Sequence, residues 1–206
     1  MQLVWKIRNI LAKQSEKPDQ YNLIQRFFGS QKMWENFVSG YIPVARVSTI
    51  LDIGCGTAEI LPYLPSDIAY IGIDSNENYI KSCRKRYPNQ TFIQGDWNSL
   101  QAECLKPPDL ILCLGLLHHL DDDSARIMLK TCYEVLRSGG KIISLDGTRE
   151  EDSGRFENLF YQVDRGRFIR SMDGYAALFP QKPETFLHEN WLRIPYRYSV
   201  CRLVKE

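Results

Sequence analysis

TILDIGCGT, residues 49–57, contains the strongest signal in this chain. Its apolar run predicts a buried strand that carries Asp52 near its end and is followed by Gly54 and Gly56. Glycines at the carboxyl end of a buried strand allow the backbone to approach a ligand closely. A second short apolar run, residues 70–73, leads into Asp74. Because an acidic side chain at that point can accept hydrogen bonds from both hydroxyls of a ribose, the pair predicts a nucleoside-bearing ligand.

Strand and helix patterns alternate from residue 49 to residue 146. After the first strand, the predicted strands are residues 70–73, 91–94, 110–114 and 141–145, with two later ones at 184–188 and 196–204. The predicted helices between the first five strands are residues 57–64, 76–86 and 121–136. This order predicts an α/β fold, a doubly wound, seven-stranded, mostly parallel sheet with right-handed crossovers. Ligands of such sheets bind beyond the carboxyl ends of the strands, where five residues of interest fall: Asp52, Asp74, Asp96, Gly115 and Asp146.

Two segments lie outside this alternation. Residues 1–48 are predicted to form an N-terminal helical extension, with a second helix around residues 21–37, in front of one domain at residues 49–206. Residues 150–182 are polar, aromatic and rich in arginine, and they read as an insertion in that domain. Residues 1–13 have an amphipathic helical pattern, which fits a helix packed on the domain better than a helix lying on a membrane surface.

Charge and cysteine usage narrow the class of protein. The 206 residues contain 26 Lys plus Arg and 25 Asp plus Glu, so no broad basic field predicts a nucleic-acid partner. No apolar run reaches the roughly 20 residues of a transmembrane helix. The six cysteines form no Cys-x-x-Cys pair, which argues against a zinc site and predicts reduced thiols in a cytoplasmic protein.

The glycine loop also limits the kind of nucleoside ligand. A dinucleotide site needs Gly-x-Gly-x-x-Gly, and its third glycine is replaced here by Glu59. The chain has no Gly-Lys-Ser/Thr sequence, so a P-loop is excluded. The pattern therefore suits a ligand without a pyrophosphate.

Five motifs in order resemble the class I S-adenosylmethionine-dependent methyltransferases. The matching segments are LDIGCGT (residues 51–57), GID (72–74), GDW (95–97), LGLLHHL (114–120) and LRSGGK (136–141). Each motif is weak alone, and the five occur in the expected order within a resemblance that runs from about residue 49 to residue 146. The resemblance implies an S-adenosylmethionine-dependent methyltransferase that releases S-adenosylhomocysteine.

The resemblance implies cofactor contacts at the first two strands. Gly54, Cys55 and Gly56 would bring the backbone against the methionine and ribose, with Asp52 near the ammonium group. Asp74 would bind the ribose hydroxyls.

Further contacts are implied along the same edge. Ser75 would flank the adenosine, Asp96 would meet the adenine amino group, and Trp97 would form an apolar wall beside the ring. Gly115 and Leu116 would lie under the methionine arm. The alternative for the acidic residues is helix capping, and for Trp97 a place in the core.

His118 and His119 are the predicted catalytic residues, because they follow the fourth strand beside the expected methyl position. A neutral imidazole can deprotonate a hydroxyl acceptor near neutral pH, whereas an amine must only be unprotonated before it attacks. The alternative is that one histidine binds backbone or cofactor.

The acceptor is expected on the segment YQVDRGRFIR, residues 161–170. Tyr161 and Asp164 would contact hydroxyl or amine groups, and Arg165 and Arg167 would hold a carboxylate or phosphate. The alternative is that the arginines form surface ion pairs with acidic residues of the same region, namely Asp152, Glu157 and Asp164.

Other acceptors and a metal are not favoured by the sequence. The run after the fourth strand is Leu-Gly-Leu-Leu, without the Asn/Asp-Pro-Pro-aromatic motif of enzymes that methylate amines of nucleic-acid bases. Residues 121–123 are three aspartates that read as a helix start and not as metal ligands. We therefore interpret the chain as an enzyme that methylates an oxygen or nitrogen of a small molecule, such as a metabolite, sugar or natural-product intermediate. The alternatives are a protein or RNA methyltransferase and a non-catalytic module of the same fold.

Overall fold

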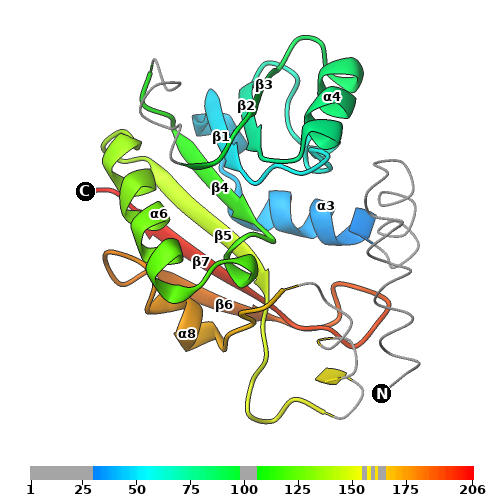
Figure 1. The fold of residues 1–206 in the computed structure, drawn as a ribbon, viewed down its shortest axis with the longest axis vertical. Helices are drawn as coiled ribbons and strands as arrows, with labels where there is room; N and C mark the ends of the chain where they lie inside the picture. Colours follow the sequence, from blue (N-terminus) through cyan, green and yellow to red (C-terminus); the bar gives the residue numbers. More distant parts are fainter. Residues whose placement is uncertain (1–29, 98–105, 155–156, 159–160, 162–165) are drawn as a thin grey trace.

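A single seven-stranded sheet organises the described part of the molecule (Figure 1). The computed structural model describes residues 30–97, 106–154, 157–158, 161 and 166–206. The strand order is β3-β2-β1-β4-β5-β7-β6. The strands are β1 (Thr49–Ile53), β2 (Ala69–Asp74), β3 (Thr91–Gln94), β4 (Leu110–Leu114), β5 (Lys141–Gly147), β6 (Glu184–His188) and β7 (Tyr198–Val204).

Strands β1 to β5 are parallel, and β7 runs antiparallel to both β5 and β6. The carboxyl ends of the five parallel strands therefore meet at one edge of the sheet. This arrangement confirms the predicted doubly wound, mostly parallel fold. The boundaries of β3, β4 and β6 match the prediction. Strands β2 and β5 extend beyond their predicted ranges, and β7 begins at Tyr198, later than predicted.

The described α-helices are α3 (Ser30–Tyr41), α4 (Glu77–Arg86), α6 (Asp122–Val135) and α8 (Met172–Ala176). Side chains cap the two crossover helices. Asn76 accepts hydrogen bonds from the first turn of α4, and Asp121 accepts one from the Ser124 N–H at 2.9 Å. Asp122 and Asp123 lie in the first turn of α6, where their negative charges interact favourably with the positive end of the helix dipole. The prediction that these aspartates begin a helix is confirmed.

The helix predicted at residues 57–64 is wrong. The connection from β1 to β2 consists of turns and one short 3₁₀ helix, η2 (Leu61–Tyr63). Ala58 has a φ of 53°, in the left-handed region, so the chain leaves the glycine loop in a conformation that cannot start an α-helix. Pro65, directly after Leu64, has no N–H to donate and disfavours helical backbone at Leu64, so this helix stays short.

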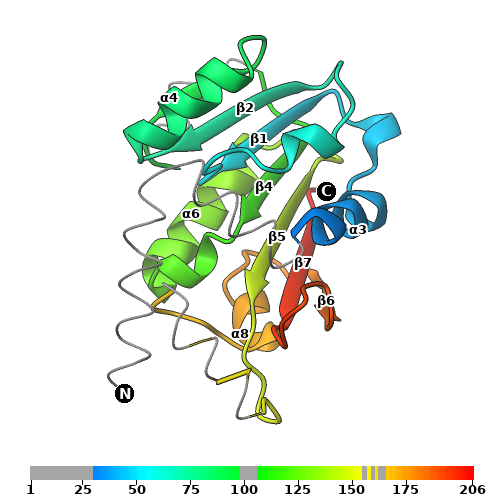
Figure 2. The ribbon, with the colours of Figure 1, turned by 90° about the vertical axis from the view of Figure 1, so that its right-hand side faces the viewer.

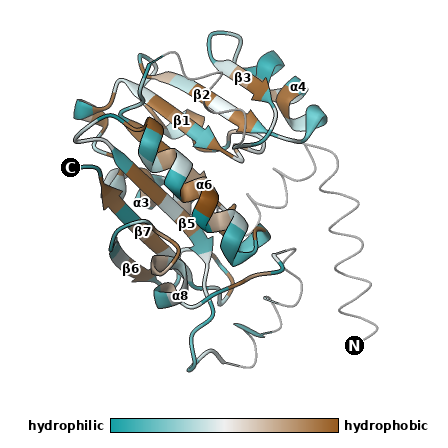
Figure 3. Ribbon diagram, turned by 60° about the vertical axis from the view of Figure 1, so that its left-hand side comes forward, coloured by the Kyte–Doolittle hydropathy of each residue, from teal (hydrophilic) through white to brown (hydrophobic). Residues whose placement is uncertain are grey.

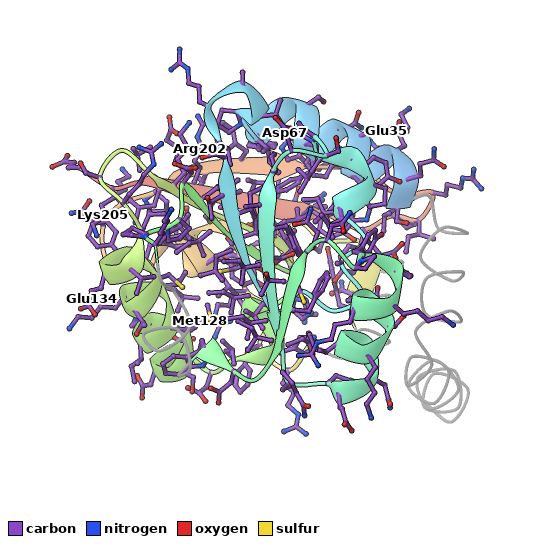
Figure 4. All side chains as sticks on the ribbon, turned by 90° about the horizontal axis from the view of Figure 1, so that it is seen from above. Glu35, Asp67, Met128, Glu134, Arg202 and Lys205 are labelled. Atoms are coloured by element: carbon purple, nitrogen blue, oxygen red, sulfur yellow. The ribbon has the colours of Figure 1, made fainter. Side chains whose placement is uncertain are left out.

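The helices cover both faces of the sheet. Figure 2 shows α3 and α6 on opposite sides of it. Phe37 of α3 and Ile80 of α4 belong to one hydrophobic cluster, and Met128 of α6 and Tyr175 of α8 belong to the other. In Figure 4, Met128 points into the protein interior, whereas Glu134 on the same helix points outward.

The central strands are buried on both faces, as continuous apolar runs in a parallel sheet require. Residues 110–113 of β4 are fully buried, and Figure 3 shows the hydrophobic colour concentrated in the central strands. Burying one such leucine or isoleucine contributes roughly 1.5 to 3 kcal/mol. This rigid centre fixes where the strands end, and hence where the loops at the carboxyl edge begin.

The described part of the N-terminal extension packs against the domain. Helix α3 buries Met33, Phe37, Val38 and Tyr41 in the first hydrophobic cluster. The start of the predicted second helix and the amphipathic residues 1–13 lie outside the described residues. Within the described ranges, no helix is long and apolar enough to span a membrane.

Candidate functional site at the carboxyl edge of the sheet

The loop after β1 turns tightly, with both of its glycines in the left-handed region of backbone conformation. Gly54 has a φ of 70° and Gly56 a φ of 53°. The backbone N–H groups of Gly54 and Cys55 both donate to the carbonyl of Ile73, at 2.8 and 3.0 Å. A Cβ atom on Gly54 would lie 2.9 Å from Cδ1 of Leu116. The loop therefore lies between the end of β2 and the residues after β4, and a side chain at Gly54 would have to displace the end of the Leu116 side chain.

The Asp74 carboxylate links this loop to the next helix. The Gly56 N–H donates to Oδ2 at 2.9 Å, and the Asn76 N–H donates to Oδ1 at 2.8 Å. The residue is half-buried, and each carboxylate oxygen has a second lone pair available. Asp74 is thus fixed in place while it can still accept hydrogen bonds from two hydroxyl groups.

Asp52 lies directly below the loop and is buried. The Tyr70 hydroxyl donates to its Oδ2 at 2.5 Å, and its Oδ1 has no hydrogen-bond partner among the described residues. Burial raises the pKa of Asp52 to about 7, against the opposing effect of the Tyr70 hydrogen bond. A donor or a cation close to Oδ1 would relieve this unsatisfied position.

The other predicted contacts at β1 and β2 differ in exposure. The Cys55 side chain is buried in the core, where the Cys83 thiol and burial raise its pKa, so only its backbone faces the loop. Ser75 is exposed in the turn before α4.

After β3, Asp96 is exposed, and Trp97 is half-buried against the second hydrophobic cluster. After β4, Gly115 has a φ of 64° and donates to the carbonyl of Leu145 at 2.7 Å. Leu116 is half-buried and contacts the Gly54 position. The structure therefore joins the Gly54 and Leu116 predictions in one place.

His118 forms a buried pair with Asp146. His118 lies in the 3₁₀ turn η4 (Leu117–His119), and Asp146 lies in β5 with no solvent exposure. His118 Nδ1 is 2.8 Å from Asp146 Oδ1, and the His118 N–H donates to the same oxygen at 3.2 Å. His119 is exposed, with its ring centroid 4.2 Å from that of His118. The sequence predicted Asp146 at this edge without a role; the available signal was its position at the end of a strand whose neighbouring strand is followed by a histidine.

Arg170 holds the turn that carries His118. Its guanidinium donates to the carbonyls of Leu117 at 2.9 Å and Leu120 at 2.7 Å, and it forms an ion pair with Asp122 at 2.7 Å. No role of Arg170 is predicted from the sequence, because its partners are backbone carbonyls far away in the chain.

The predicted acceptor residues are described only in part. Tyr161 is buried, with its ring centroid 5.1 Å from that of Tyr196. Tyr161 and Arg167 line a cavity of about 220 Å³, and the Arg167 side chain is exposed. Asp164 and Arg165 lie outside the described residues.

Arg197, and not Arg167, forms ion pairs with the acidic side chains of this region. Arg197 binds Asp152 at 2.5 Å, Glu157 at 3.1 Å and Glu189 at 3.1 Å. Arg167 pairs with neither Asp152 nor Glu157 among the described residues, and its other alternative partner, Asp164, lies outside them. Across the described ranges, no group of three or more His, Cys, Asp or Glu side chains is arranged to hold a metal ion.

Comparison with known proteins agrees with this geometry. Residues 50–140 match the family model described as "Methyltransferase domain". The ubiquinone/menaquinone biosynthesis C-methyltransferase UbiE of Escherichia coli is 28% identical over 129 residues, which are 58% of this chain and 50% of that protein. The chain thus spans about half the length of the curated relatives it matches.

Solved structures share the fold across nearly the whole chain. The plantazolicin methyltransferase BpumL, solved with a triazolic desmethylPZN analog and SAH, superposes with a TM-score of 0.68 at 16% identity, covering 100% of this chain and 98% of that one. A SAM-dependent methyltransferase from Archaeoglobus fulgidus superposes with a TM-score of 0.68 at 19% identity, covering 89% of this chain and 99% of that one.

The fold and its carboxyl edge define the class, a doubly wound α/β domain of the methyltransferase type. Residues 50–140 of the chain match a methyltransferase domain, and the fold of the chain is similar to that of solved S-adenosylmethionine-dependent methyltransferases.

Proposed function

We propose that this chain transfers the methyl group of S-adenosylmethionine to the oxygen or nitrogen of a small-molecule acceptor and releases S-adenosylhomocysteine. The observation that carries the proposal is the glycine loop tied to Asp74, with the Gly56 N–H 2.9 Å from the carboxylate. Such a loop brings backbone and a fixed carboxylate to one nucleoside-sized position.

The residues present fit this cofactor on two independent observations. Gly56 has a φ of 53°, and no atom lies within 4 Å of the place where a Cβ would stand, so open space adjoins the loop backbone there. Asp52 Oδ1 is buried and unpartnered among the described residues, and the cofactor ammonium would satisfy it. On this basis Gly54, Gly56 and Asp52 hold the methionine and Asp74 holds the ribose.

The remaining cofactor contacts are proposed from the same edge. Ser75 and Asp96 would bind the adenosine, Trp97 would lie beside its ring, and Gly115 and Leu116 would support the methionine arm. Cys55 contributes its backbone, because its side chain is buried in the core.

When bound, the cofactor supplies a methyl group that its sulfonium has already activated. The chain must align the acceptor and exclude water. Asp146 accepts a hydrogen bond from His118 Nδ1, which directs the basic lone pair of the imidazole to Nε2. His118 would thus take the proton of a hydroxyl acceptor, and the adjacent His119 would help to orient it. Arg170 positions His118 through the carbonyls of Leu117 and Leu120.

A small acceptor is favoured over a macromolecule. The cavity beside Tyr161 and Arg167 measures about 220 Å³, which suits a small molecule. The charge balance of 26 basic against 25 acidic residues counts against RNA. The N-terminal residues 1–48 and the insertion 150–182, with Asp164 and Arg165, are proposed to close over the acceptor.

The test is formation of S-adenosylhomocysteine from S-adenosylmethionine in the presence of a panel of hydroxyl- and amine-bearing metabolites. We expect at least one acceptor to raise product formation above the rate without acceptor, and His118→Ala to reduce that increase. Unchanged turnover in His118→Ala, with unchanged cofactor affinity, would remove His118 from the chemistry.

A further inference from the structure

The cavity beside Tyr161 carries a chemical preference of its own. Two arginines line it, Arg149 and Arg167, together with Asn158, Tyr161, Gly166 and Ile169. We propose that the methyl acceptor bears an oxyanion, a carboxylate or a phosphate, and that Arg149 and Arg167 bind it in this cavity. The inference rests on the proposed function, because it concerns the acceptor of the same reaction.

Among the described residues, the guanidinium groups of Arg149 and Arg167 carry unpaired positive charge. Both side chains are exposed, and in the described part of the chain neither forms an ion pair or a side-chain hydrogen bond. Three other arginines in the described part of the chain are paired: Arg86 with Glu59, Arg137 with Asp109, and Arg202 with Glu184. The arginines at the cavity are therefore available to a ligand.

The acidic side chains near the cavity already have other hydrogen-bond or ion-pair partners. Arg197 gathers Asp152, Glu157 and Glu189. Glu150, directly after Arg149, accepts hydrogen bonds through Oε1 from Thr148 Oγ1 at 2.9 Å and from the Met172 N–H at 2.8 Å. The described lining of the cavity contains two positive charges and no carboxylate. Such a cavity favours an anion and disfavours a cationic amine.

The cavity also lies beside the chain segments that carry the buried pair of His118 and Asp146. Arg149 follows β5 three residues after Asp146, in the loop that extends beyond this strand in Figure 1. Its N–H donates to the carbonyl of Arg170 at 3.1 Å. On the other side, Arg167 precedes Phe168, whose N–H donates to the carbonyl of His118 at 2.9 Å.

These contacts connect both arginines through the backbone to the segments that carry His118 and Asp146. An oxyanion held at the arginines would orient the rest of a small acceptor for attack at the opposite end. Guanidinium groups suit this task because they bind carboxylate and phosphate oxygens through paired hydrogen bonds.

The experiment measures binding of simple probes to the full chain saturated with S-adenosylhomocysteine. Benzoate and phenyl phosphate are compared with uncharged benzamide by ligand-observed NMR titration. The variants are Arg149→Gln, Arg167→Gln and the double variant. Arg46→Gln is the matched control, because Arg46 is exposed and precedes β1 at the opposite edge of the sheet.

We expect each anion to bind at least about tenfold more tightly than benzamide, and each single variant to lose about tenfold of that affinity, as the loss of a charge-assisted hydrogen bond predicts. Arg46→Gln should bind like the wild type. Equal affinity for benzamide and the anions, no anion binding at millimolar concentrations, or full anion affinity in the double variant would overturn the inference. Calorimetry with S-adenosylhomocysteine separates the two failures: if the cofactor binds and the anions show no preference, the inference alone fails.

Discussion

The N–H of Gly56 donates to Asp74 Oδ2 at 2.9 Å, so the loop after β1 and the end of β2 form one unit. The Asn76 N–H binds the other oxygen of the same carboxylate, at 2.8 Å. Asp74 therefore has two tasks in this account. It holds the loop in its left-handed course, and it presents its remaining lone pairs to the ribose.

Replacing Asp74 by Ala should weaken binding of S-adenosylhomocysteine by roughly 1 to 3 kcal/mol, because charge-assisted hydrogen bonds to the ribose and the loop are lost. Isothermal titration calorimetry measures the change. Asp67→Ala is the control, since Asp67 is an exposed acidic residue that precedes β2 at the other edge. Equal affinity in Asp74→Ala and the wild type would show that Asp74 does not contact the ribose.

Replacing Gly54 by Ala should reduce cofactor affinity and stability. The added Cβ meets Leu116 at 2.9 Å, and a φ of 70° is costly for alanine, by about 1 kcal/mol or more. Gly40→Ala in α3 introduces the same methyl group where no atom lies within 4 Å. That control should leave binding unchanged and raise the free energy of unfolding by about 0.5 to 1 kcal/mol, as measured by urea denaturation. Similar effects of the two substitutions would contradict the role given to the loop.

The contribution of Asp52 to the free energy of unfolding without ligand should fall as the pH rises from about 4 towards 7. Burial raises the pKa of Asp52 from 3.8 to about 7, so in this range the folded protein keeps a proton that the unfolded chain has lost. The stabilisation from this group is therefore complete below the unfolded pKa and is lost as the pH passes the folded pKa. The slope from this one group is at most about 1.4 kcal/mol per pH unit.

Asp52→Asn keeps the shape and the acceptor for the Tyr70 hydroxyl but does not titrate. Urea denaturation at a series of pH values should show a flatter profile for this variant than for the wild type. Asp109 does not confuse the comparison, because hydrogen bonds lower its pKa to about 2, below this range. Parallel profiles for wild type and variant would mean that Asp52 is ionised in the folded protein.

Replacing Asp146 by Asn should lower kcat for a hydroxyl acceptor while cofactor affinity is retained. The amide binds His118 Nδ1 less well and no longer favours the tautomer with the lone pair at Nε2. His118→Ala should lose more, roughly 100-fold or above, because general-base catalysis itself is removed. A pH–rate profile and the separate changes in kcat and KM measure both effects. If His119→Ala shows the larger loss instead, the base is His119.

Much of the fold could be predicted from local sequence. The central strand at residues 110–114 is a continuous apolar run, and such runs read clearly when both faces of a strand are buried. Asn76 and Asp121 marked the starts of α4 and α6, since caps act within a few residues. The helix predicted after Thr57 is absent, because Ala58 has a left-handed φ of 53° and Pro65 follows the short 3₁₀ helix η2.

The site was predicted less completely, because its decisive contacts are not local. The strand-end residues Asp52, Gly54 and Asp74 follow from the motif and the topology. The pairing of His118 with Asp146 depends on the register of β4 beside β5, which the sequence does not specify. Arg170 acts on backbone carbonyls, and no residue pattern marks such partners. Arg149 lines the cavity together with Arg167 only because residues 166–170 lie beside the loop that follows β5, and the sequence does not specify this long-range contact.

The central claim is that the loop from Gly54 to Gly56 binds S-adenosylmethionine together with Asp74. Isothermal titration calorimetry of the purified full chain with S-adenosylmethionine and S-adenosylhomocysteine tests it most directly. The account predicts one site per chain with micromolar affinity for both compounds, weakened in Asp74→Ala and retained in Asp67→Ala. No binding of either compound at micromolar concentrations would contradict it.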